Sequence, residues 1–171
     1  EFGTVRVITR SDDPTLKTIE ITPFRKEAKY SDKRHPDSVS FADRLEDDLA
    51  RRDFTVNAMA LKITNNQILD LFNGQQDIEK KIIRAVGDPH DRFGEDALRM
   101  MRAVRFEVQL GFAIEEATAR AIHEHAGLLR FIAKERIRDE FIKIIMSDHA
   151  AEGVELLRRL GLLSLFLPEL E

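Results

Sequence analysis

The sequence predicts an α+β fold in which a front part of strands and loops precedes an all-helical rear part, with the boundary near residue 88. Apolar residues alternate with polar ones at a period of two in the front part, which is typical of strands. From residue 91 onward they recur at helical spacing, and glycines stand near the expected helix ends. The 171 residues, 43% of them hydrophobic, suffice for one sizeable core or two small modules that share an interface.

The front part begins with two predicted strands and a predicted loop. Val5 and Val7, and later Ile19 and Ile21, alternate with polar residues, so we expect two half-buried strands that pair or lie side by side. Residues 25–37 carry eight charged side chains and no apolar period, which predicts a mobile loop.

A short helix should follow this loop. Ser40 is a suitable N-cap, and Phe41, Leu45 and Leu49 recur at the i, i+4, i+8 spacing of one helix face. We expect this helix to end near Arg51.

A hairpin and four helices complete the predicted elements. Residues 61–64 and 68–72 should pair around Asn65 and Asn66, because asparagine tolerates the positive φ of tight turns. The β structure is expected to end near Gly87. The predicted helices span residues 91–110, 115–126, 134–147 and 150–160.

Composition excludes several classes of protein. The 27 basic and 31 acidic residues leave a net charge of −4, so any contact with RNA must come from local patches. There is no cysteine for disulfides or thiolate metal sites, and no apolar run approaches the roughly 20 residues that span a bilayer. Without a recognisable signal peptide, a cytoplasmic protein is expected. The first strand has almost no chain before it and residues 162–171 are strongly apolar, so we expect a fragment of a longer protein.

Arginine recurs at every third position of the first predicted rear helix, at Arg99, Arg102 and Arg105. At about 100° per residue, the apolar side chains of this helix form a separate buried stripe, made of Ala97, Met100, Met101, Val104 and Val108. One interpretation is a solvated face on which Glu95 and Asp96 pair with Arg99, for about 0.3 kcal/mol each. The alternative is an anion site, because the arginines repel one another and Arg102 and Arg105 have no acid at helical spacing. A triphosphate would compensate them, since guanidinium groups bind phosphate oxygens bidentately.

Asp96 and Arg99 together suggest recognition of a base. Cytosine and adenine both present an amine donor beside a ring-nitrogen acceptor. An aspartate can accept from that amine while an arginine donates to the ring nitrogen, whereas uracil and guanine present the reverse pattern. Such a pair would accept C and A and reject U and G.

A second arginine motif, residues 51–58, is a common surface cluster when taken alone. Together with residues 95–106, however, it closely resembles the class II tRNA nucleotidyltransferases, which are the CCA-adding enzymes, and their relatives, the bacterial poly(A) polymerases. The likeness extends over essentially the whole chain, through the strand around Glu20 and residues 30–36, 70–74, 92–93, 110–112, 135–137, 161–163 and 167–169.

The resemblance implies domains and roles. Residues 1–87 would be the C-terminal part of a nucleotidyltransferase head with a mixed β-sheet, residues 88–147 an all-α neck that selects the nucleotide, and residues 148–171 the start of a helical body. Asp96 and Arg99 would recognise the base, and Asp53 would contact the ribose. Arg52, Arg102 and Arg105 would hold the triphosphate, with Asn57 supporting the pocket.

The implied activity is template-independent addition of C and A to tRNA 3′ ends from CTP and ATP, with a homodimer formed through the helical body. The family's loop before the first arginine motif is present here as residues 25–37, which favours A-adding or full CCA-adding activity. A poly(A) polymerase and a non-catalytic nucleotide- or RNA-binding module that lost its metal site both stay open.

Such enzymes use two metal ions, expected to be Mg²⁺, held by an Asp-x-Asp pair and a third acid. The pair and the Gly-Gly turn before it are absent, and only Glu20 is a candidate for the third, catalytic and metal-binding acid. We therefore expect no transfer by this chain alone. His123 and His125 diverge on their helix, and Asp148 with His149 is an incomplete set, so neither pair predicts another metal site.

Overall fold

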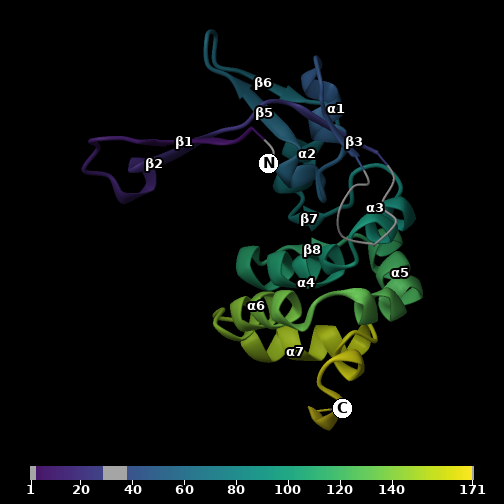
Figure 1. The fold of residues 1–171 in the computed structure, drawn as a ribbon. Coiled ribbons are helices and arrows are strands. Elements are labelled where there is room, and N and C mark those ends of the chain that lie inside the picture. Colours follow the sequence, from purple (N-terminus) through teal and green to yellow (C-terminus); the bar gives the residue numbers. More distant parts are fainter. Residues whose placement is uncertain (1–2, 29–37, 171) are drawn as a thin grey trace.

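The computed structural model describes residues 3–28 and 38–170, and it confirms the α+β prediction (Figure 1). The strands and first two helices lie at one end, and the remaining helices stack at the other. The described strands are β1 (Val5–Ile8), β2 (Thr18–Ile21), β3 (Arg25–Ala28), β4 (Ser38–Phe41), β5 (Met59–Lys62), β6 (Gln67–Asp70), β7 (Ile82–Ile83) and β8 (Ala113–Ile114). The described α-helices are α1 (Leu45–Ala50), α2 (Gly74–Glu79), α3 (Pro89–Glu95), α4 (Leu98–Leu110), α5 (Glu116–His125), α6 (Lys134–Ile145) and α7 (Ala150–Arg159).

Strands β1 and β2 form the predicted antiparallel pair, with Val5 opposite Ile21 and Val7 opposite Ile19. They are not half-buried as predicted, because every residue of both strands is exposed. The hairpin projects from the rest of the molecule, and no other described element covers either of its faces (Figure 1).

The segment predicted as a loop is partly a strand. Residues 25–28 form β3, which pairs antiparallel with β4 in a register that places Lys26 opposite Ser40. The rest of the predicted loop, residues 29–37, lies outside the described residues. Strand pairing also overturns the predicted cap, because both Ser40 and the next residue, Phe41, belong to β4, so no helix begins directly after Ser40. Helix α1 starts at Leu45 instead, where three acidic residues fill its first turn.

The β5–β6 hairpin confirms the prediction for its turn, and Asn66 adopts a φ of 54°. The prediction that β structure ends near Gly87 is wrong, because β8 pairs in parallel with β7. The backbone N–H of Ala113 donates to Lys81 O (2.8 Å), and Glu115 N–H donates to Ile83 O (2.9 Å). Two-residue strands 30 positions apart carry too little local pattern for sequence periodicity to detect.

The helix predicted over residues 91–110 is two helices, α3 and α4, which break at Asp96 (φ −142°, ψ 104°). The Asp96 carboxylate accepts a hydrogen bond from Leu98 N–H (3.1 Å), which satisfies the first amide of α4. Aspartate competes for backbone amides in this way, and the competition favours helix ends over helix interiors. The arginines of α4 therefore begin within one turn of a helix N-terminus.

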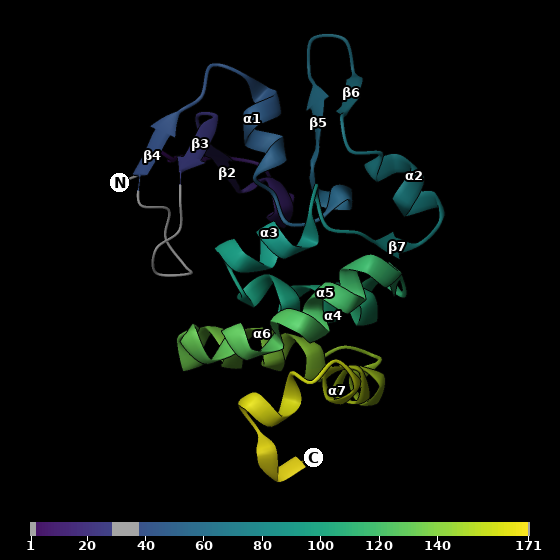
Figure 2. The same ribbon diagram turned by 90° about the vertical axis from the view of Figure 1, so that its right-hand side faces the viewer.

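Helix α4 forms the centre of the helical part, where it packs against α6 and α7, while α3 packs on α5 (Figure 2). All five residues of the predicted apolar stripe are buried, so that prediction is confirmed. The core continues without interruption from Phe54 to residues of α7 and the C-terminal segment, including Leu157 and Leu163. The domain boundaries at residues 87 and 147 stay predictions, since one core spans both. Among the described residues, no helix is long and apolar enough to cross a membrane.

Candidate functional site

A cavity of about 470 Å³ lies between the front part and the helical part. Its lining consists of Arg51, Arg52, Asp53, Asn57, Asp96, Leu98, Arg99, Arg102 and Arg136. The structure thus brings both arginine motifs, which are more than 40 residues apart in sequence, into one polar pocket. Five guanidinium groups against two carboxylates give the lining a net positive charge, which suits a polyanion.

The segment that carries Asp53 is held rigidly by the core beneath it. Phe54 is fully buried and meets Phe106 of α4 edge to face, with ring centroids 5.7 Å apart. Asp53 O accepts from Val86 N–H (3.0 Å), and Thr55 Oγ1 donates to the buried Asp77 carboxylate (2.7 Å). These contacts fix both sides of Asp53, so its carboxylate enters the pocket from an immobile backbone.

Asp53 and Arg102 form an ion pair across the pocket, with Arg102 Nη2 and Asp53 Oδ2 2.6 Å apart. Asp53 Oδ1 accepts from Phe54 N–H (2.9 Å) and from Asn57 Nδ2 (3.4 Å). Asn57 O accepts from Arg52 Nη1 (2.9 Å). Asp53 is predicted to contact the ribose, Arg52 and Arg102 to hold the phosphates, and Asn57 to support the pocket. These residues are therefore neighbours that bond to one another.

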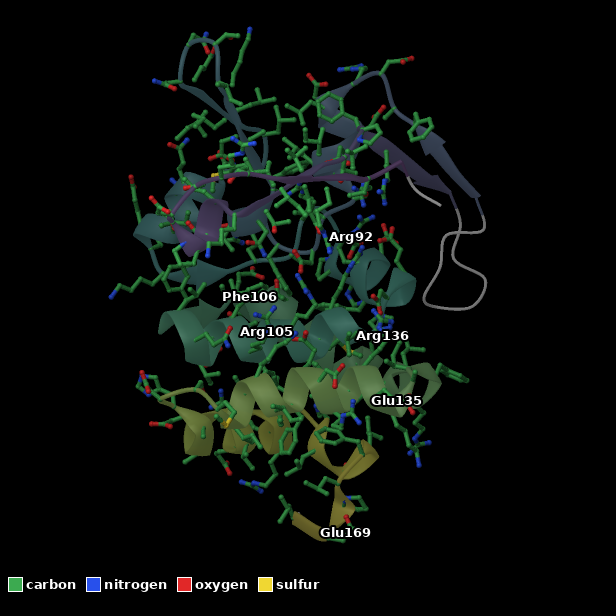
Figure 3. The ribbon with its side chains drawn as sticks, turned by 60° about the vertical axis from the view of Figure 1, so that its left-hand side comes forward. Arg92, Arg105, Phe106, Glu135, Arg136 and Glu169 are labelled. Atoms are coloured by element: carbon green, nitrogen blue, oxygen red, sulfur yellow. The ribbon has the colours of Figure 1, made fainter. Side chains whose placement is uncertain are left out.

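Arg105 lies outside the pocket lining. Its Nε donates to Glu140 Oε2 of α6 (2.7 Å), and its guanidinium carbon lies 4.2 Å from the centre of the Phe106 ring. In Figure 3, Arg105 and Phe106 lie on α4, at a distance from the labelled Arg92 of α3. Arg102 and Arg105 have no acid at helical spacing, but Asp53 and Glu140 compensate their charges from other elements. Helical spacing cannot reveal acids on other elements.

Asp48 of α1 orients the first arginine motif through hydrogen bonds. This buried carboxylate accepts from Arg51 Nη2 (2.6 Å) and Arg52 Nη2 (3.4 Å), and also from the backbone N–H of Arg25 (3.2 Å). Burial acts to raise the pKa of Asp48, but the hydrogen bond and charge of Arg51, with the other donors, outweigh it. The pKa therefore lies below its ordinary value, and the carboxylate stays charged beside the arginines.

Arg99 is fixed by α3 and by the end of α1. Its Nη1 donates to Glu95 Oε2 (2.6 Å) and to Arg92 O (3.1 Å), and its Nη2 donates to Arg51 O (3.0 Å). These bonds join the two arginine motifs directly and orient the Arg99 guanidinium.

Asp96 is held by a residue that the sequence did not single out as functional. Arg136 Nη2 of α6 lies 2.7 Å from Asp96 Oδ2, and Arg136 lines the cavity. In the sequence, Glu135 and Asp139 are interleaved with the basic residues of this helix, a pattern that is typical of a mixed-charge solvated face. The partner of Arg136 is 40 residues away, so no local pattern identifies it.

Two family models match the chain: the poly A polymerase head domain over residues 1–84, and a probable RNA and SrmB-binding site of polymerase A over residues 111–171. The chain belongs to the family of CCA-adding enzymes and poly(A) polymerases. It is 50% identical to the CCA-adding enzyme of Lactobacillus helveticus over 154 residues, which are 90% of this chain and 37% of that protein. The CCA-adding enzyme of Pediococcus pentosaceus is 52% identical over 155 residues, which are 91% and 38%.

Solved structures of this family have the same fold. The crystal structure of the Bacillus stearothermophilus CCA-adding enzyme in complex with CTP matches with a TM-score of 0.81 at 43% identity, over 94% of this chain and 37% of that one. A tRNA nucleotidyltransferase complexed with a primer tRNA and an incoming ATP analog matches with a TM-score of 0.80 at 28% identity, over 97% and 45%. The chain thus spans less than half the length of these relatives.

The described residues do not form the metal centre expected for this family. Glu20 is exposed on β2 and accepts from Arg6 Nη2 (2.8 Å). No three His, Cys, Asp or Glu side chains gather to hold a metal ion anywhere in residues 3–28 and 38–170. His90 and His125 have ring nitrogens 3.0 Å apart. The catalytic and metal-binding role of Glu20 stays a prediction.

Proposed function

We propose that this chain supplies the nucleotide-selecting part of a CCA-adding tRNA nucleotidyltransferase, which adds C and A to tRNA 3′ ends in the cytoplasm from CTP and ATP. One observation carries the proposal: the two arginine motifs, from separate elements, line the same cationic cavity. Two structural neighbours are complexes, one with CTP and one with a primer tRNA and an incoming ATP analog, which supports the same substrates.

The base would be recognised by Asp96 and Arg99. Both line the cavity, and each is oriented by bonds that do not depend on a ligand. Asp96 would accept from the exocyclic amine of cytosine or adenine, while Arg99 would donate to the adjacent ring nitrogen. Uracil and guanine would place a carbonyl at Asp96 and an N–H at Arg99, which leaves acceptor facing acceptor and donor facing donor.

The triphosphate would bind at Arg52 and Arg102, and the ribose at Asp53. Arg102 is bonded to Asp53. A bound nucleotide would exchange that bond for one from a ribose hydroxyl to Asp53 and one from Arg102 to a phosphate oxygen. The exchange keeps every charged group hydrogen-bonded, so it avoids the cost of leaving a buried polar group without a partner.

Arg105 is the least supported of the predicted phosphate ligands. It would have to leave the buried Glu140, whose side chain is only 6% exposed. We therefore propose that Arg105 joins α4 to α6 and orients this helix, and that Arg52 and Arg102 provide the main phosphate contacts.

Two measurements test the proposed function. Binding of CTP, ATP, UTP and GTP to the chain should show clear preference for CTP and ATP, and equal affinities for all four would refute it. The complete enzyme, given tRNA without its last nucleotides, should stop after a fixed number of additions, whereas continued polyadenylation would identify a poly(A) polymerase. A homodimer through the helical part is a further proposal, which sedimentation of the complete enzyme would test.

A further inference from the structure

We propose that Arg136 is a positioning residue that determines base specificity by holding Asp96, and this inference rests on the proposed function. Arg136 lies in the first turn of α6 and approaches Asp96 with both terminal nitrogens. Nη2 lies 2.7 Å from Oδ2, and Nη1 lies 3.4 Å from Oδ1. Figure 3 shows Arg136 between α4 and α6, below Arg92.

Asp96 depends on such a partner because it is not part of a helix. Its backbone is extended between α3 and α4, so its side-chain rotamers are not restricted as they would be inside a helix. The described structure supplies donors to both oxygens instead: Leu98 N–H and Arg136 Nη1 on Oδ1, and Arg136 Nη2 on Oδ2. Leu98 N–H alone would leave the carboxylate free to rotate about that single bond, whereas two donors on different oxygens fix its plane.

The fixed plane has a chemical consequence for the ligand. A carboxylate offers about four lone-pair sites. Leu98 N–H and Arg136 Nη1 approach Oδ1, and Arg136 Nη2 approaches Oδ2, so one site on Oδ2 is left to face the cavity, which both Asp96 and Arg136 line. An amine at the base edge can then bond to Asp96 in one geometry, aligned with Arg99. Precise alignment is what makes a donor–acceptor pair discriminate between bases.

Two simpler roles for Arg136 predict different behaviour. If it only joined α6 to the rest of the fold, it would duplicate the Arg105–Glu140 pair and the buried Ile137 and Ile144 of the same helix. If it only held phosphate, its loss would weaken every triphosphate by the same factor. A positioning role predicts that loss of Arg136 weakens the binding of CTP and ATP but leaves the affinity for the triphosphate group unchanged.

The test uses the 171-residue chain with Arg136→Gln, which removes the charge and keeps much of the side-chain length. Dissociation constants are measured for CTP, ATP, UTP, GTP and inorganic tripolyphosphate. We expect the ratio of the UTP constant to the CTP constant to fall by about tenfold, in line with the worth of one well-aligned base contact. Tripolyphosphate binding should change by less than about threefold.

Two further variants control the experiment. Arg138→Gln removes an arginine from the same helix whose bonds go only to the adjacent Asp139, and it should leave every constant unchanged. Arg136→Lys keeps one bond to Asp96 without the planar fork, so it should restore part of the discrimination. It carries the same test should Arg136→Gln fail to fold.

The outcomes separate this inference from the proposed function. Equal weakening of all five ligands by Arg136→Gln, or an unchanged UTP-to-CTP ratio, would overturn the role of Arg136 alone. Equal affinity of the unaltered chain for all four nucleotides would overturn the proposed function, and the role of Arg136 with it.

Discussion

The Glu140→Gln substitution tests whether Arg105 stabilises the helical part by joining α4 to α6. The Glu140 side chain is 6% exposed and lies between Arg105 (2.7 Å) and Lys143 (2.8 Å). Removing its charge leaves the 13%-exposed Arg105 guanidinium without a carboxylate. Because glutamine keeps one acceptor and Lys143 is half exposed, we expect a cost of about 3 kcal/mol, the low end for breaking a buried pair.

The pH dependence of the same variant gives a second check. Burial acts to raise the pKa of Glu140, but the hydrogen bonds and charges of Lys143 and Arg105 outweigh it, so the pKa lies below its ordinary value of 4.5. A carboxyl with a depressed folded-state pKa contributes stability above its unfolded pKa, and this stability is lost as the pH falls through the folded value. The difference between Glu140→Gln and the unaltered chain should therefore be constant near neutral pH and shrink below pH 4.5.

Urea unfolding followed by circular dichroism measures both effects, with Glu155→Gln as the matched control. Glu155 is exposed and, among the residues that the structure describes, forms its ion pair with Arg158 on its own helix, so its substitution should not change the free energy of unfolding measurably. An unfolding free energy of Glu140→Gln equal to that of the unaltered chain at pH 7 would refute the role assigned to Arg105. A difference that does not shrink below pH 4.5 would contradict the charge-based explanation.

Two further predictions concern packing and the pocket. Gly153→Ala should cost about 1–3 kcal/mol of unfolding free energy by overpacking, since a Cβ there would lie 2.5 Å from Ile144 Cγ2. Gly94→Ala, whose Cβ would meet nothing within 4 Å, should instead stabilise the chain in the same urea titration. Asp48→Asn should weaken CTP, ATP, UTP and GTP equally, by about tenfold, because it loosens the arginines that hold phosphate. Loss of affinity for CTP and ATP alone would show that Asp48 acts on the base instead.

The buried half of α4 could be predicted from sequence because it is a local property. The spacing of Met100, Met101 and Val104 alone places them on one face, and the fold buries them accordingly. The hairpin at Asn66 was predictable for the same reason, since its turn needs a residue that tolerates positive φ. The resemblance added the link between the two arginine motifs, which periodicity cannot show.

The predictions that proved wrong concern residues whose decisive contacts do not show in the local pattern. Ser40 has the chemistry of a cap, but pairing with β3 commits its backbone to a strand. Asp96 interrupts a helical pattern that runs through it, because its carboxylate bonds to the next helix's first amide. Arg136 and Glu140 show the mixed-charge pattern that is typical of a solvated face, although their partners lie on α4 and at the α3–α4 junction. Each of these residues shows an ordinary local pattern and a specific tertiary one.

An ATP analogue that lacks only the exocyclic amine, purine riboside triphosphate, shows whether Asp96 accepts the amine of the base. We expect the chain to bind the analogue about tenfold more weakly than ATP. This difference should disappear in Asp96→Ser, which keeps an oxygen to cap Leu98 but not the carboxylate. Equal affinity of the unaltered chain for ATP and the analogue would rule out base recognition by Asp96.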